Sequence, residues 1–308
     1  MDRDQLTGIT LILLILVVYT HFFAPKPAPQ PAALAQEQTQ QGQGQHHTSS
    51  AHMAQDAPPA LTTQGVEQEV VLENEVVKVT LSSQGGSIKQ VVLKQYKDPQ
   101  GEPLVLLDAH SSHMGFQWAH PDVSLDSHAA FFVTEDKDQC VSGAEKAQAT
   151  FLLPLEAGKY LKHTFSLSGQ GYTLTHDWEM VGLGEQFAGV PLQFVWRNHI
   201  KHAEKDIVAC RNKTTINYYL ADRDTFDGLP ERTDKPQEQL IHRPILWIGM
   251  KQRFFTAAVI ADSPFVDGYM ATRPPRFGET TVKEAQVRLT LPETDAQQDR
   301  KGQFTFYF

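Results

Sequence analysis

The feature that most constrains the fold is a repeated alternation of apolar and polar side chains. Between Tyr172 and Met180 every second residue is apolar or aromatic except His176, and the residues between them are Thr, Asp or Glu. The pattern recurs over 77–81, 161–167 and 192–196. A period of two residues is typical of half-buried strands in a mostly antiparallel sheet. Helical periodicity over more than ten residues is hard to find, so the sequence predicts an all-β fold built as a large two-sheet sandwich.

Turn residues separate these runs. Turns are predicted at 84–87, 98–101, 182–184, 227–228 and 274–275, where Gly, Pro and Asp cluster. Two polar stretches, 111–130 and 221–240, are predicted as long loops.

The first 64 of the 308 residues differ in composition from the rest. Leu6 to Phe23 is an 18-residue stretch without Lys, Arg, Asp or Glu, and it would span roughly 27 Å as a helix. A cleaved signal peptide would need small residues directly after it, but Phe22-Phe23-Ala24-Pro25 follows. We therefore interpret 1–24 as a transmembrane anchor, 25–64 as a disordered tether rich in Gln, Pro and Ala, and 65–308 as the folded domain.

Charge and cysteine content exclude several classes of protein. Lys and Arg number 27 against 36 Asp and Glu, a net charge of −9, which argues against nucleic-acid binding. Two cysteines, Cys140 and Cys210, are too few for a disulfide-rich scaffold or a four-cysteine zinc site. They are compatible with one bridge or with two free thiols. The sequence has no Gly-rich phosphate loop, Gly-x-Ser-x-Gly or His-Glu-x-x-His motif.

Histidines are the strongest candidates for chemistry. Four of them lie close to three aspartates: His110, His113, His120 and His128, with Asp108, Asp122 and Asp126. Their spacing matches no zinc pattern, and a polar loop is the preferred interpretation. His199 and His202 would meet only on a helix, and a solvated face is favoured. His46, His47 and His52 fall in the tether, where solvated residues are favoured over a metal tract.

Two further features suggest sugar chemistry. His176, beside Trp178 on an apolar strand face, could form an acid/base pair with a carboxylate, although a hydrogen-bonded core histidine is the preferred interpretation. Four tryptophans could form a stacking platform, although core packing is favoured: Trp118, Trp178, Trp196 and Trp247.

Several segments together resemble one protein family. The opening Met1–Ile9 resembles the start of the bacterial YidC family of membrane protein insertases. Blocks similar to the family's large periplasmic domain follow in family order to about Ile260: 71–81, 84–88, 91–97, 103–106, 203–205, 214–218 and 247–255.

The resemblance implies a function that the patterns alone do not. It implies a periplasmic β-super-sandwich similar to galactose mutarotases but without sugar catalysis, hence no enzyme, no cofactor and no catalytic or metal residues. It implies a bacterial inner-membrane location with a cytoplasmic amino terminus. The implied partners are nascent integral membrane proteins, the Sec translocon and the lipid bilayer.

One departure from the family affects the expected mechanism. No apolar run after Phe23 is long enough to span a membrane, so the family's five further spans and their charged groove are missing. We expect this chain, whether a fragment or a natural short form, not to insert proteins by itself. The alternatives are a membrane-anchored aldose epimerase or a carbohydrate-binding β-sandwich.

Overall fold

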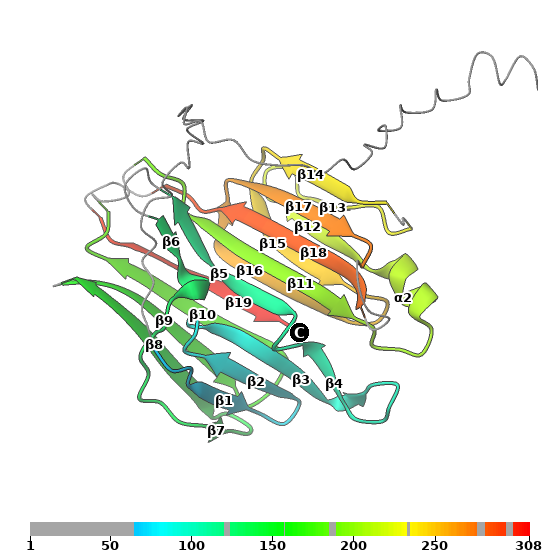
Figure 1. Cartoon of the computed structure of the whole chain (residues 1–308), viewed down its shortest axis with the longest axis horizontal. Coiled ribbons are helices and arrows are strands. Elements are labelled where there is room, and N and C mark those ends of the chain that lie inside the picture. Colours follow the sequence, from blue (N-terminus) through cyan, green and yellow to red (C-terminus); the bar gives the residue numbers. More distant parts are fainter. Residues whose placement is uncertain are drawn as a thin grey trace, which may run out of the picture. The chain divides into compact units, whose positions relative to one another are not determined.

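The structure is a computed structural model, and it describes residues 65–119, 124–156, 158–184, 189–232, 235–275, 281–293 and 298–308. The predicted anchor and tether, with His46, His47 and His52, lie outside these residues. The described part is all-β, as expected, apart from the short helix α2 (Ile207–Lys213) and the 3-10 turn η1 (Ser127–Ala129) (Figure 1). Across these described ranges, no helix combines the length and apolarity needed to cross a bilayer.

The strands form three hydrogen-bonded sheets, which corrects the prediction of two. The five-stranded sheet has the order β4 (Pro103–Leu107), β3 (Ser87–Lys97), β2 (Val77–Ser82), β1 (Glu69–Glu73) and β7 (Gln139–Cys140). The eight-stranded sheet has the order β13 (Thr225–Gly228), β12 (Thr215–Leu220), β15 (Ile245–Lys251), β16 (Thr256–Phe265), β19 (Arg300–Tyr307), β10 (Thr173–Val181), β9 (Lys159–Ser168) and β8 (Lys146–Glu156). The six-stranded sheet has the order β14 (Gln237–Ile241), β17 (Asp267–Arg273), β18 (Thr281–Thr290), β11 (Gln193–Lys201), β5 (Ser112–Ala119) and β6 (Ser124–Asp126).

The strongest sequence alternation corresponds to strand β10. Leu174, His176, Trp178 and Met180 are buried, and the residues between them are not. β10 pairs antiparallel with β9 and β19, and this register places His176 opposite Phe165 and Phe304. The prediction of half-buried antiparallel strands is therefore confirmed here.

Both predicted long loops contain strands. The stretch 111–130 includes β5, whose Met114, Phe116 and Trp118 are buried, and 221–240 includes β13 and most of β14. The predicted turn at 227–228 is also wrong. The chain turns earlier, at 221–224, where Asp224 has a φ of 53°. In β5 the polar residues that alternate with the buried ones make the stretch look like a loop, and β13 has no buried residue that could signal a strand.

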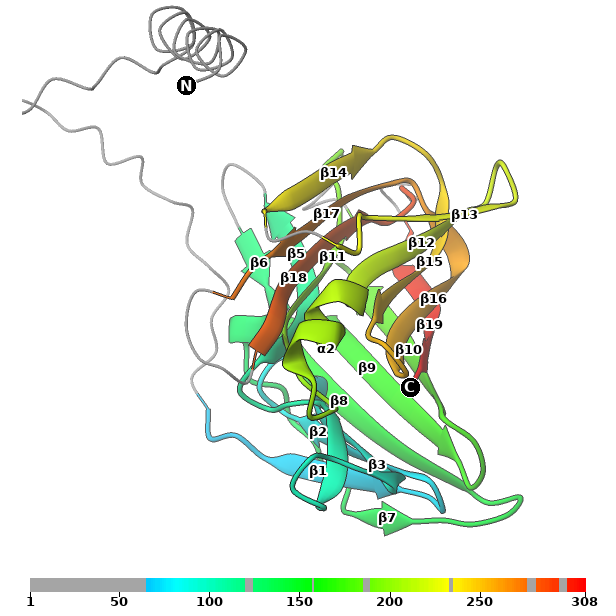
Figure 2. The same cartoon turned by 90° about the vertical axis from the view of Figure 1, so that its right-hand side faces the viewer.

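The three sheets share one apolar core. Phe194 of the six-stranded sheet packs against Phe304 of the eight-stranded sheet, with ring centroids 5.1 Å apart. Phe132, which follows η1, lies 4.9 Å from His163 of β9. Figure 2 shows β14 at one end of the domain and the strands β1 to β3 at the other.

Candidate functional site

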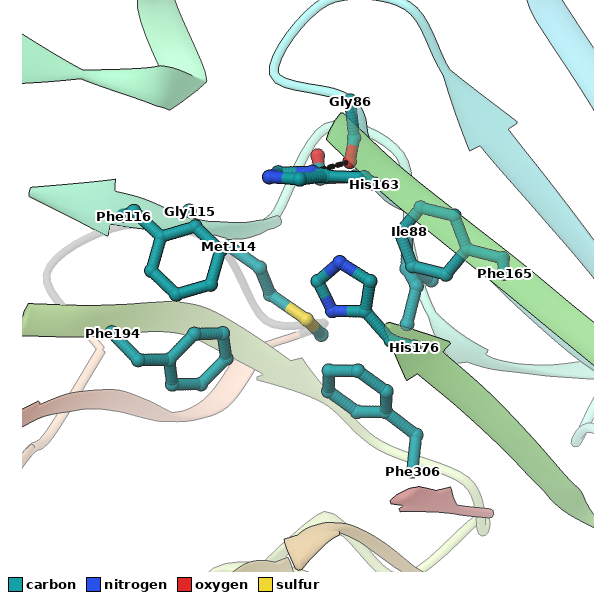
Figure 3. A pocket seen from close by; sticks show the side chains of 11 residues that line it. Gly86, Ile88, Met114, Gly115, Phe116, His163, Phe165, His176, Phe194 and Phe306 are labelled. Carbon is teal, nitrogen blue, oxygen red and sulfur yellow. Dashed lines mark hydrogen bonds between the residues drawn. The ribbon is translucent and has the colours of Figure 1, made fainter. Parts of the chain in front are cut away.

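The least expected feature of the core is a pair of buried histidines. His163 of β9 and His176 of β10 are exposed by only 1% and 4%, and their ring centroids lie 4.9 Å apart. Both side chains point into a small cavity where the three sheets meet (Figure 3).

The two histidines have few hydrogen bonds. His163 Nδ1 lies 2.6 Å from the Gly86 carbonyl oxygen, and because a carbonyl only accepts, this nitrogen carries the proton and donates. His163 Nε2 and both ring nitrogens of His176 have no partner within the described part of the chain. Three buried polar atoms without partners are costly in an apolar core.

Aromatic rings surround the pair. His176 stacks on Phe165 at a centroid distance of 4.3 Å and an angle of 10°, and Phe116, Phe194 and Phe306 are also among the residues that line the cavity. The space open to the centre of a water molecule is about 10 Å³, which is close to the minimum for one water. The cavity can therefore supply a water to the free nitrogens, but it is too small for a sugar.

Burial keeps both imidazoles neutral. Desolvation lowers the pKa of His163 to about 4, although its bond to the Gly86 carbonyl acts in the opposite direction. Desolvation, and to a smaller extent the neighbouring His163, lowers the pKa of His176 well below its ordinary 6.5. Among the described residues that line the cavity there is no carboxylate, so they do not provide the alternative considered for His176, an acid/base pair. His176 is a buried core histidine, as the preferred interpretation held, but no described residue makes the expected hydrogen bond to it.

A second cluster lies on the other side of β5. His113 of β5 and His128 of η1 have ring centroids 4.7 Å apart, and with Asp126 and Arg197 they line a surface cleft of about 20 Å³ of water-accessible space. Asp126 is already engaged, because its carboxylate accepts from Gln117 Nε2 and from the His128 amide. Burial, and then the nearby His128, lowers the pKa of His113.

The structure thus brings together only part of the predicted histidine cluster. His110 is exposed, and its amide donates to Asp108; His120 and Asp122 lie outside the described residues. His199 is in β11 rather than on a helix, and His202 follows that strand. In the described ranges, no three His, Cys, Asp or Glu side chains are grouped so that they could hold a metal ion.

The remaining candidates are also placed. Trp118, Trp178 and Trp196 are buried in the core, whereas Trp247 is half-buried and stacks on Tyr219 with centroids 6.0 Å apart. Four tryptophans therefore do not form a sugar platform. Cys140 is exposed, Cys210 is buried, and both are free thiols, which decides the open question of a bridge.

Sequence reasoning missed the contributions of Gly86 and β5 to the cavity. A signal for β5 was present, because Met114, Phe116 and Trp118 alternate with His113, Gly115 and Gln117. The Gly86 contact joins residues 77 positions apart, and no local pattern reports such a pairing.

The described residues form an all-β domain around one core rich in aromatic side chains. The family model for the YidC periplasmic domain matches residues 69–308, so the chain belongs to that family. This confirms the resemblance read from the sequence.

The relatives extend beyond this chain. It is 43% identical over 317 residues to the membrane protein insertase YidC of Amoebophilus asiaticus and 28% identical over 331 residues to that of Cytophaga hutchinsonii. Each match covers 100% of this chain and 52% of the relative. The chain thus spans about half the length of these curated relatives.

Solved structures are more distant. A galactose mutarotase related enzyme from Lactobacillus acidophilus is 10% identical, with a TM-score of 0.48, covering 78% of this chain and 97% of that one. A galactose mutarotase-like protein from Lactobacillus casei is 10% identical, with a TM-score of 0.49, covering 78% and 99%. The predicted galactose-mutarotase-like super-sandwich stays a prediction.

Proposed function

We propose that this chain is the amino-terminal part of a membrane protein insertase, with residues 1–24 as an anchor, 25–64 as a tether and 65–308 as a periplasmic domain. The observation that carries this proposal is the match of the family model to 69–308, together with relatives named as insertases along the whole chain. The bacterial inner membrane is the proposed location. Nascent membrane proteins, the Sec translocon and lipid are the proposed partners.

In this proposal the described domain assists insertion and does not perform it. A path through lipid must satisfy backbone polar groups along its length. The described strands instead direct their apolar side chains into one shared core. We therefore assign the domain a role as a docking surface, spacer or cover, without enzymatic chemistry.

Complementation tests this division of labour. Bacteria depleted of their own insertase would receive residues 1–308, or a chimera of 1–308 with the unmatched half of the Amoebophilus asiaticus relative. We expect the chimera to restore insertion of a reporter membrane protein and 1–308 alone to fail at equal expression. Restoration by 1–308 alone, or failure of a well-expressed chimera, contradicts the proposal.

The size of the native protein provides a second test. An antibody against residues 65–308 would detect the protein in membranes of its own cells. The proposal predicts a species far heavier than 34.5 kDa. A species of 34.5 kDa would contradict the proposal. The domain would then have an accessory or binding role, without an insertase core in the same chain.

A further inference from the structure

The edge of the eight-stranded sheet at β8 is covered by a segment that is not a regular strand. β8 ends the strand order of that sheet, so backbone groups on its outer side face away from β9 and need other partners. Residues 133–139 run antiparallel along this side, and we call them the edge segment. At its start, the Val133 amide donates to the Leu152 carbonyl at 2.7 Å, and the Leu152 amide donates to the Val133 carbonyl at 2.9 Å.

Side chains take the place of a strand further along the edge. The Thr150 amide donates to Asp136 Oδ2 at 2.7 Å. The Gln148 amide donates to Gln139 Oε1 at 3.0 Å, and Gln139 Nε2 donates to the Gln148 carbonyl at 2.6 Å. The carboxamide of Gln139 thus makes the pair of hydrogen bonds that a backbone residue of an antiparallel strand would make. This part of the edge already binds a peptide-like group.

The register explains why side chains are needed. The partners of residues 152, 150 and 148 are residues 133, 136 and 139, so the edge segment advances by three residues for every two of β8. A regularly paired strand advances residue for residue. The backbone of the edge segment therefore cannot follow the edge, and the side chains of Asp136 and Gln139 reach it instead.

The edge segment buries little of itself. None of its side chains is buried, and Val133 is exposed by 57%. Its far end is attached through β7 and through the Asp138 carboxylate, which accepts from the Val71 amide at 2.8 Å. Segments with few buried contacts open at a low cost in free energy, so residues 134–137 are the part of this edge that is most easily displaced.

The outer edge of β8 has the chemistry of a site for an extended chain. Residues 147–153 alternate between buried and not buried side chains, and positions 148, 150 and 152 direct backbone groups outward. Pro154, which has no amide hydrogen, limits this stretch at its end. An extended polypeptide repeats a donor and an acceptor about every 6.8 Å, which is two residues of a strand. Small ligands do not offer that repeat.

We propose that the outer edge of β8 is a strand-addition site for an extended segment of another polypeptide, and that the edge segment closes this site until it is displaced. The proposal goes beyond the proposed function, because it does not depend on an insertase core. Its test measures peptide binding rather than protein insertion, so the two proposals can fail separately.

The test uses the whole 1–308 chain and a fluorescent peptide, Lys-Thr-Val-Thr-Val-Thr-Val-Thr-Lys, whose β-branched residues favour an extended conformation. A control peptide carries Pro at its three Val positions and so lacks those amide hydrogens. Asp136→Ala/Gln139→Ala opens the edge. Glu135→Ala/Lys137→Ala is the matched control, because it changes two exposed side chains of the same segment. Fluorescence anisotropy measures the Kd.

A second variant closes the site covalently. Val133→Cys/Leu152→Cys, in a Cys140→Ser background, places two cysteines at the bridged pair. The Cα atoms of such a pair lie about 5.5 Å apart, which is within the range of a disulfide. The oxidised chain holds the edge segment on β8, and reduction releases it in the same protein.

We expect Asp136→Ala/Gln139→Ala to bind the peptide about tenfold more tightly than the native chain, because three hydrogen bonds no longer compete with it. The matched control should keep the native Kd, and the proline peptide should not bind. The oxidised disulfide variant should not bind either, and reduction should restore binding. Circular dichroism would verify that each variant is folded.

Four outcomes would overturn the proposal. The first is that the opened variant binds no more tightly than the matched control. The second is equal binding of the proline peptide. The third is equal binding by the oxidised and reduced disulfide variant, a comparison that holds even if the opened variant does not fold. The fourth is a molar mass of the opened variant that doubles with concentration without peptide, which assigns the edge to a second copy of the chain.

Discussion

At the scale of single residues, His163 and His176 couple the stability of the core to pH. Their pKa values are lowered in the folded domain, whereas an unfolded histidine titrates near 6.5. The unfolded state therefore binds more protons as the pH falls below 6.5. The free energy of unfolding therefore does not depend on these two histidines well above pH 6.5, and it declines as the pH falls toward 4. His163 alone accounts for a loss of about 3 kcal/mol.

Replacing His176 tests this coupling. His176→Phe removes one titrating ring and keeps an aromatic side chain beside Phe165. We expect the free energy of unfolding, measured with urea between pH 7 and 4.5, to decline less steeply in the variant than in the native chain. Thr173→Phe, at an exposed position of the same strand β10, adds an aromatic ring without changing a titrating group, so it is the control and should keep the native slope. Equal slopes for His176→Phe and the native chain would contradict the assignment.

Lys283 is a buried charged residue that connects two segments of the chain through hydrogen bonds. It is 3% exposed, and its ammonium donates to the carbonyls of Thr214 at 2.6 Å and Glu231 at 2.7 Å. Desolvation lowers its pKa. The side chain therefore joins the carboxyl end of α2 to the segment after β13.

Lys283→Met should leave both carbonyls without that donor. We expect a loss of about 1–3 kcal/mol in the free energy of unfolding. Lys205→Met, at an exposed position, should stay within about 0.5 kcal/mol of the native value. If Lys283→Met lowers the free energy of unfolding no more than Lys205→Met does, the two hydrogen bonds of Lys283 do not stabilise the fold.

At the scale of elements, η1 is held against β5 through a glycine. The Phe116 amide donates to Ser127 Oγ at 2.8 Å. A Cβ at Gly115 would lie 2.8 Å from that oxygen and 3.2 Å from the His128 nitrogen. The absence of a side chain at 115 thus allows η1 to approach β5 and bring His128 beside His113.

Gly115→Ala should push η1 away from β5. We expect a destabilisation of about 1–3 kcal/mol. Ser127→Ala removes the nearest contact, so it should cost less in the Gly115→Ala background than in the native chain. Thermal unfolding of the two single variants and the double variant measures this coupling, and additive costs would exclude the steric account.

The strands also show which features of the fold can be predicted from the sequence and which cannot. The alternation that predicts β10 and β9 reflects side chains facing one core, and this is a local property. The pairing of strands is not local: β1 pairs with β7 about 67 residues away, through Leu72 and Gln139. The same limit hid the third sheet and the contact between Gly86 and His163. The family resemblance, in contrast, depends on ordered blocks along the chain and was confirmed.

At the scale of the whole molecule, the two cysteines report whether the fold is intact. Cys140 lies exposed in β7, and Cys210 lies buried in α2. A thiol reagent should modify one cysteine per native chain and both after denaturation, as read by mass spectrometry. Cys140→Ser should leave no reactive thiol in the native state. A native chain that reacts twice, or not at all, would contradict this arrangement.

The strand order of the eight-stranded sheet also has a consequence for synthesis. β19 lies between β16 and β10, so it joins one group of four strands to another group of three. Both groups are complete by Phe265, but each keeps an open hydrogen-bonding edge until residues 300–307 are free. Completion of the eight-stranded sheet therefore depends on contacts between residues distant in sequence, and it comes late in folding. While a ribosome or membrane pore retains Arg300–Tyr307, the two groups stay unjoined and open to association with other chains.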